Sequence, residues 1–308
     1  MTIYIILIGI GLVVISTIAT LIAESRRKTS AERFGLRFGL DVPEDLEPTI
    51  RYGVQARRVG SPIGTLIAVT TAVVLLLLHP GLSLLAAWWC LFGAYLVGAS
   101  LGATIALLVA EQKRDRGILR VARTKAVVVA DYVPSIQSVL VRVFVALAVI
   151  VFAADCWLAA SVSPNFLSIV SGLLAWLSVV TLIIYEFESR RLIRRGAPAG
   201  TPLELAWDDG LRAYALTNLN GTVGLIPLYS LIAYDTLSLN STGIYSNPLF
   251  PVFTGLFPVV ATVGILMLIV FMTRVRTRQH FLRRLWPDLA AKVDDNVDGS
   301  YASIMGGR

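Results

Sequence analysis

The chain has 308 residues, of which 56% are hydrophobic and 15% are charged, and its mean hydropathy is +0.74. Soluble domains carry about 25% charged residues, so this composition excludes an ordinary soluble domain and indicates a membrane protein. The two cysteines, Cys90 and Cys156, are too few for a disulfide scaffold, and no Cys/His spacing indicates a metal site.

Seven apolar segments are long enough to cross a bilayer core of roughly 30 Å as helices. They are residues 3–23, 62–79, 84–110, 141–160, 166–185, 219–236 and 249–272. The sixth segment is the weakest, because Gly221, Gly224 and Pro227 interrupt it. The first segment is interpreted as an uncleaved span, since no basic region precedes it and RRK at 26–28 follows it directly.

The basic residues lie on one side of the predicted membrane. Seven spans place 24–61, 111–140, 187–218 and 273–308 on the same side, and with Arg142 these segments contain every Lys and Arg. The three opposite loops contain none. The positive-inside rule therefore predicts that the N-terminus lies outside and the C-terminus in the cytoplasm. The net charge of +7 then indicates contact with anionic lipid and argues against nucleic-acid binding.

The predicted fold is all-α: a polytopic transmembrane helical bundle of about seven spans with amphipathic cytoplasmic helices, one of them over 117–132. Residues 1–290 are expected to form one domain in the lipid bilayer. Residues 291–308 are polar, and we expect a disordered cytoplasmic tail there. The sequence does not fix the oligomeric state.

The stretch TPLELAWDDGLRAYALTNL at 201–219 has the pattern of a capped acidic helix between two apolar segments. Thr201 is a good N-cap, Pro202 suits the first helical position and Glu204 completes a capping box. Its apolar face is expected to dock on protein. The partner is either the basic segment 113–125 of the same chain or a separate cytoplasmic subunit. The candidate docking residues are Glu204, Trp207, Asp208, Asp209 and Leu211.

Ionisable residues inside apolar spans are candidate functional sites. Asp155 is the best candidate for a cation or proton site, followed by Asp235 near the outer end of the sixth span; simple hydration is the alternative for both. Arg142 is expected to extend towards the inner headgroups. Glu186 is expected to pair with an arginine at 190–191.

Small residues recur at every fourth position of the third span. A stripe of this kind lets another helix approach closely, either within the chain or in a homodimer. The residues of the stripe are Ala94, Gly98, Gly102 and Ala106.

The sixth and seventh spans are interrupted by glycine and proline. Broken helices free backbone groups that hold ions and substrates in transporters, although a kink that serves packing is the alternative. The residues that define this candidate region are Gly224, Pro227 and Pro258.

The chain lacks the Walker A, GxSxG and HExxH motifs, so the sequence predicts no enzyme, catalytic residue, metal or cofactor.

A family resemblance rests on ELAWDDGLRA (204–213), the Pro/Gly linker before it and ADYVP (130–134). Through these stretches, the chain resembles a family of uncharacterised multi-spanning membrane proteins of high-GC Gram-positive bacteria. The resemblance implies a plasma-membrane location and no assigned reaction. The predicted function is transport-associated, as a membrane subunit or permease-like component of unknown substrate. The alternative is a membrane scaffold or regulatory protein that recruits a cytoplasmic partner without transport.

Overall fold

The computed structural model describes residues 46–78, 84–113, 127–158, 166–194, 201–240 and 280–291, together with positions 9, 11, 35, 40 and 42. These residues are almost entirely helical, and none of them forms a strand. The helices are α3 (Glu47–Leu78), α4 (Leu84–Lys113), α5 (Val129–Tyr132), α6 (Ser135–Leu158), α7 (Phe166–Arg194), α8 (Pro202–Asn240) and α11 (His280–Leu285). The predicted all-α fold is confirmed.

Four of the described helices are long and apolar enough to cross a membrane. Their candidate spans are Ile50–Leu78 in α3, Ala87–Gln112 in α4, Ser135–Ala154 in α6 and Ile169–Arg194 in α7. The predicted membrane class is therefore supported. The predicted spans at 3–23 and 249–272 and the tail at 291–308 lie outside the described residues, apart from isolated positions, so the count of seven spans stays a prediction.

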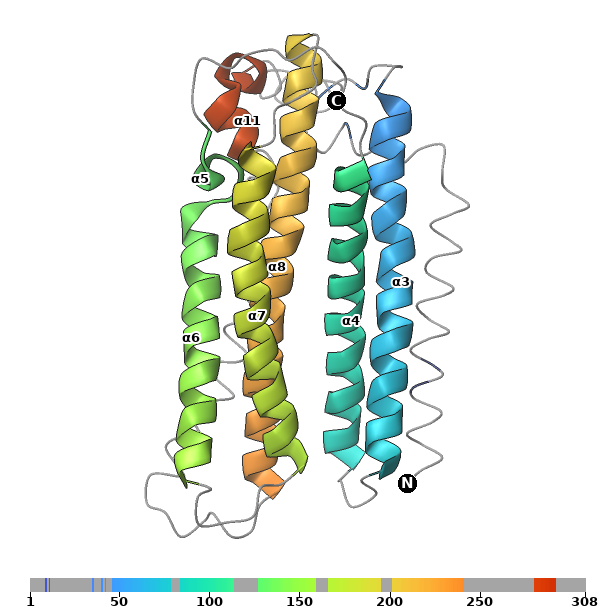
Figure 1. The fold of residues 1–308 in the computed structure, drawn as a ribbon, viewed down its shortest axis with the longest axis vertical. Coiled ribbons are helices and arrows are strands. Elements are labelled where there is room, and N and C mark those ends of the chain that lie inside the picture. Colours follow the sequence, from blue (N-terminus) through green and yellow to red (C-terminus); the bar gives the residue numbers. More distant parts are fainter. Residues whose placement is uncertain are drawn as a thin grey trace, which may run out of the picture.

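The long helices run side by side as a bundle (Figure 1). α3 and α4 form an antiparallel pair, and α6, α7 and α8 form a second group next to it. α3, α6 and α8 begin at the end of the bundle where α4 and α7 finish and where α5 and α11 lie. We call this end the charged end, because the described arginines lie in the part of the bundle nearest to it.

α3 begins well before the predicted span at 62–79. The helix starts at Glu47 and passes through Pro62 without interruption. The helix that carries the predicted span at 62–79 therefore begins earlier than the span, and Pro62 lies inside it because proline is tolerated within helices that pack in a membrane. Gly9, a described position before this helix, is itself helical, and a Cβ added there would lie 2.7 Å from the Val73 side chain of α3.

α8 combines two predicted elements in one helix. The acidic helix at 201–219 and the sixth span at 219–236 form a continuous helix of 39 residues, which corresponds to a length of about 58 Å. The helix begins where the sequence predicts, because the Thr201 hydroxyl accepts a 3.2 Å hydrogen bond from the Glu204 amide. Since α8 is longer than the bilayer core is thick, its first turns extend past the apolar part of the bundle at the charged end (Figure 1).

The structure describes the predicted amphipathic helix at 117–132 from residue 127 onward. Residues 127 and 128 are not helical, and α5 is a single turn. The Asp131 carboxylate closes this turn by accepting a 3.0 Å hydrogen bond from the backbone amide of Val128. α5 is therefore a short, capped turn that leads into α6. Within the described residues, no long surface helix precedes it.

Candidate functional site

α8 is the central helix of the described bundle. Almost every residue from Leu205 to Leu231 is buried, and α4, α6, α7, α5 and α11 all pack against this helix. A helix buried on all sides is expected to be apolar all round. α8 instead carries buried polar side chains in two zones, one at the charged end and one within the apolar part of the bundle.

The first zone centres on the carboxylate of Asp209, which is fully buried. Its Oδ1 accepts a 2.8 Å hydrogen bond from the Tyr132 hydroxyl in α5. Its Oδ2 accepts a 3.0 Å hydrogen bond from the indole Nε1 of Trp286, just after α11. One carboxylate thus joins three segments that are far apart in the sequence.

The neighbouring residue, Asp208, makes a buried ion pair within α8. Nη2 of Arg212 lies 2.8 Å from Oδ2 of Asp208, and the two side chains are 6% and 2% exposed. The i,i+4 spacing places both groups on one face of the helix. Nearby, the Arg57 guanidinium of α3 donates to the Tyr214 hydroxyl and lies over its ring, which ties α3 to the same part of α8.

α11 is fixed to α5 as well as to α8. Nε2 of His280 donates a 2.9 Å hydrogen bond to the backbone carbonyl of Ala130, and Nε of Arg284 lies 3.7 Å from Oδ1 of Asp131. Phe281, which is fully buried, packs on Gly210, where an added Cβ would meet the ring at 3.3 Å. α11 therefore forms, with α5, a cap over the start of α8.

This burial bears directly on the predicted docking helix at 201–219. Trp207, Asp208, Asp209 and Leu211 are buried in the chain's own cluster with Tyr132, Val133, Leu192, Phe281 and Leu282. They are not on a free surface that a separate subunit could contact, and Glu204 alone of the five is partly exposed. The expected internal partner, 113–125, lies almost wholly outside the described residues. The observed partners are α5 and α11.

The second polar zone joins α8 to α4 within the bundle. The Thr222 hydroxyl lies 2.7 Å from the hydroxyls of both Ser100 and Thr104. Thr222 is 20 residues into α8, so the zone lies about 30 Å along the helix from its start. Further along, the Ser230 hydroxyl donates a 2.9 Å hydrogen bond to the Ser171 carbonyl of α7. Most hydroxyls here are therefore satisfied by neighbouring helices.

Asn220 departs from this pattern. The side chain is 4% exposed, and its Oδ1 accepts no hydrogen bond from the residues that the structure describes. By contrast, Nδ2 of Asn218, two residues earlier, donates a 2.7 Å hydrogen bond to the Tyr214 carbonyl one turn before it. A buried acceptor without a partner costs about 1–3 kcal/mol, so its presence in a central helix calls for an explanation.

The small-residue stripe of the third span lies against α3. Gly98 and Gly102 face Gly60 and Gly64, and a Cβ added at Gly98 would lie 2.6 Å from the Gly64 carbonyl oxygen. The backbones of the two helices thus approach as closely as glycine allows. Ala106 meets Gly60 at the end of the same contact. An internal contact therefore occupies this part of the stripe.

The remaining predicted site residues are only partly placed. Asp155 lies near the end of α6 and Asp235 near the end of α8, and the side chains of both lie outside the described residues. Gly224 and Pro227 lie within the continuous helix α8, so the predicted break is not found there. Pro258 lies outside the described residues. Proline is tolerated inside α8 because surrounding helices cover it, and the predicted role of this region in binding stays a prediction.

Among the described residues, no group of three His, Cys, Asp or Glu side chains is placed to hold a metal ion. Comparisons with protein families, curated proteins and solved structures find no match for this chain. The resemblance through 130–134 and 204–213 therefore stays a prediction, and the function is argued from the geometry. Sequence reasoning missed Thr222 and Asn220, and the signal that could have found them is that both are polar residues within the predicted sixth span.

Proposed function

We propose that the chain is a transport-associated integral membrane protein in which α8 lines the path of the substrate. The observation that carries this proposal is Asn220, near the middle of the central helix, whose buried carbonyl oxygen has no hydrogen-bond donor among the described residues. Polar groups inside a membrane bundle are costly, and those that persist commonly mark a pathway for ions or solutes. An acceptor without a hydrogen-bond partner can accept a hydrogen bond from a donor group of a solute.

The chemistry of the zone favours a neutral, hydrogen-bonding solute. The described polar groups at this height of the bundle are the hydroxyls of Ser100, Thr104 and Thr222 and, on another face of α8, the amide of Asn220, and none of these carries a charge. Such groups recognise hydroxyl and amide donors without the desolvation cost that a fully charged site imposes. The substrate itself is unknown.

The distribution of charge supports a plasma-membrane location with the charged end in the cytoplasm. The arginines of α3, α6, α7 and α11 lie towards this end, while the loops at 79–83 and 161–165 contain no Lys or Arg. This is the asymmetry that the positive-inside rule describes. The cap formed by α5, α11 and the start of α8 is then a cytoplasmic structure.

The proposal is tested by the water accessibility of position 220. Replacement of Cys90 and Cys156 by serine gives a background without thiols, in which Asn220→Cys is exposed to a charged methanethiosulfonate reagent in proteoliposomes. A hydrated path predicts modification at Asn220→Cys, because a thiol must ionise in water to react. Ile226→Cys, a fully buried position on the same helix, is the dry control, and Arg190→Cys on the surface is the reactive control. An inert Asn220→Cys with reactive Arg190→Cys would refute the path.

The competing function is a membrane scaffold or regulatory protein that moves nothing. The observation that favours it is the mutual satisfaction of Ser100, Thr104 and Thr222, since hydroxyls that bond across helices also serve simply to hold membrane helices together. The two functions differ in the solute pools of cells. Under the transport proposal, cells that express the chain and cells that express Asn220→Leu differ in at least one intracellular or extracellular polar metabolite. Identical pools support the scaffold.

A further inference from the structure

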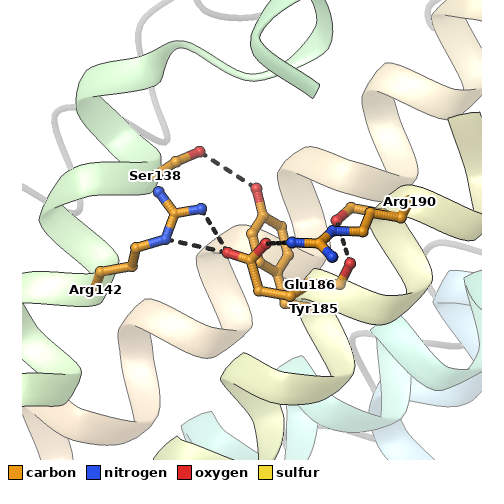
Figure 2. Close-up of polar contacts among 6 residues, drawn as sticks. Ser138, Arg142, Tyr185, Glu186 and Arg190 are labelled. Carbon is orange, nitrogen blue, oxygen red and sulfur yellow. Dashed lines mark hydrogen bonds and ion pairs between the residues drawn. The ribbon is translucent and has the colours of Figure 1, made fainter. Parts of the chain in front are cut away.

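An ion pair on the outer face of α6 and α7 lies inside the candidate membrane spans. Nε of Arg142 in α6 donates a 3.1 Å hydrogen bond to Oε1 of Glu186 in α7, and Nη2 of Arg142 contacts the same oxygen (Figure 2). Nη2 of Arg190 lies 3.9 Å from the other oxygen, Oε2. The sequence predicted a pair between Glu186 and 190–191, but its closer partner is Arg142 on the neighbouring helix.

The cluster faces outward from the bundle. The side chains of Arg142, Glu186 and Arg190 are 49%, 33% and 71% exposed. The exposed apolar residues Val143 and Ile183 flank it on the same two helices. Charged residues within spans normally face the bundle interior, so a cluster on the lipid-facing side needs a partner outside the described bundle.

The inner side of the cluster fixes its geometry. Tyr185 is buried, and its hydroxyl lies 3.3 Å from the hydroxyl of Ser138 in α6 (Figure 2). This contact joins α6 to α7 one turn from Arg142, so the two helices hold the guanidinium groups at a set spacing. Arg142 lies seven residues after the start of α6, which places it about 10 Å into the helix from the charged end.

The charges do not cancel within the cluster. Two guanidinium groups share the single carboxylate of Glu186, which leaves one net positive charge. The adjacent pair of Arg191 and Glu188 is neutral, with 3.0 Å between Nη1 and Oε1. Each guanidinium has five donors in a planar fork that matches a phosphate, and those of Arg190 are largely free to point outward.

We propose that this cluster is a binding site for the phosphate of an anionic phospholipid. The phosphate lies between Arg142 and Arg190 at the level of the inner headgroups, and the acyl chains follow the apolar faces that include Val143 and Ile183. Basic pockets between membrane helices at the cytoplasmic side bind anionic headgroups in this way. Because the cluster has a net positive charge, an anionic lipid is preferred over a zwitterionic one. The site does not depend on whether α8 transports a solute.

The test measures lipid binding to the full chain purified in neutral detergent, by native mass spectrometry with phosphatidylglycerol or phosphatidylcholine added. The wild-type chain is expected to retain phosphatidylglycerol in preference to phosphatidylcholine. The double variant R142Q/R190Q is expected to bind phosphatidylglycerol on the order of 10-fold to 30-fold more weakly, since it loses two arginines at the surface of the membrane. R51Q, which removes one arginine of α3 at the same end, is the control for loss of a positive charge away from the cluster and is expected to bind like the wild type.

Glu186→Gln provides the decisive comparison, because the proposal predicts a change in phosphatidylglycerol binding opposite in direction to that of R142Q/R190Q. Removal of the competing carboxylate frees both guanidinium groups, so phosphatidylglycerol binds more tightly than to the wild type. A purely structural ion pair predicts no gain in lipid binding from this change. The proposal is overturned if wild type binds both lipids equally, if R142Q/R190Q binds as wild type does, or if Glu186→Gln lowers binding. If R142Q/R190Q does not fold, Glu186→Gln decides alone.

Discussion

The hydroxyl of Tyr132 donates a 2.8 Å hydrogen bond to Oδ1 of Asp209, across 77 residues of sequence. The two residues belong to the segments ADYVP and ELAWDDGLRA, so the two short motifs that stand out in the sequence meet in the fold. Trp286 completes the junction from the C-terminal side by donating to Oδ2 of the same carboxylate. The acidic residues at the start of α8 therefore organise the cap of the bundle, which explains why a membrane chain carries them there.

Tyr132→Phe removes one of the donors to the buried carboxylate and is expected to lower the free energy of unfolding by about 1–3 kcal/mol. The loss arises because Oδ1 of Asp209 stays buried without that donor. The free energy is measured by titration with sodium dodecyl sulfate in mixed micelles. Tyr52→Phe, at an exposed tyrosine of α3, is the matched control and is expected to have no measurable effect.

A double-mutant cycle between Tyr132→Phe and Asp209→Asn isolates the pair. Residues that share a hydrogen bond couple by about 0.5–3 kcal/mol, so the double variant is expected to lose less than the sum of the two single losses. Strict additivity of the two changes would show that the hydrogen bond contributes nothing and would contradict the role given to the junction.

Trp207→Ala is expected to lower the free energy of unfolding by about 3–5 kcal/mol, because Trp207 is fully buried in the cluster around the start of α8. Thermal denaturation followed by light scattering measures the loss. Trp176→Ala is the matched control on α7, where the side chain is 63% exposed on the outer face of the bundle and its removal leaves no cavity. If Trp207→Ala left stability unchanged and instead released a co-purifying subunit, Trp207 would be a docking residue.

The sequence predicted the fold class and the individual apolar segments because both depend on local patterns. Hydropathy over about 20 residues defines a span, and the Thr201 cap depends on its immediate neighbours. The burial of Asp208 and Asp209 could not be predicted in this way. An acidic face normally indicates a solvated surface, whereas Asp208 pairs with Arg212 within α8 and Asp209 is bonded by Tyr132 and Trp286, which come from distant parts of the chain.

The continuity of α8 was missed for a related reason. Gly221, Gly224 and Pro227 weaken a helix in water, so the sequence divided 201–236 into an acidic helix and a broken span. In the fold, neighbouring helices cover this segment almost completely, and tertiary packing outweighs local propensity. Thr222, in the same segment, joins α8 to α4 by hydrogen bonds.

Gly64→Ala is expected to destabilise the contact between α3 and α4 by about 1–3 kcal/mol, because the added methyl would lie 2.7 Å from the Gly102 Cα. Gly53→Ala on the same helix is the matched control, since nothing lies within 4 Å of a Cβ there. Alanine is a better helix former than glycine, so Gly53→Ala is expected to be neutral or stabilising by up to about 1 kcal/mol. Thermal denaturation in detergent compares the two. Equal effects at both positions would contradict the close packing of the helices.

Asn220→Leu tests separately what the buried amide costs in stability and what it contributes to function. An apolar side chain of similar size leaves no unsatisfied acceptor, so this change is expected to be neutral or to raise the free energy of unfolding by about 1 kcal/mol. Asn218→Leu is the matched control two residues away on α8. It loses the 2.7 Å hydrogen bond to the Tyr214 carbonyl and is expected to destabilise or to be neutral. Unfolding in sodium dodecyl sulfate measures both.

A residue that is retained at a cost to stability is expected where function needs it, so the proposal predicts that the more stable Asn220→Leu protein no longer alters the solute pools of cells. A large loss of stability in Asn220→Leu would show instead that the amide holds the bundle together, and the argument for a path along α8 would fail.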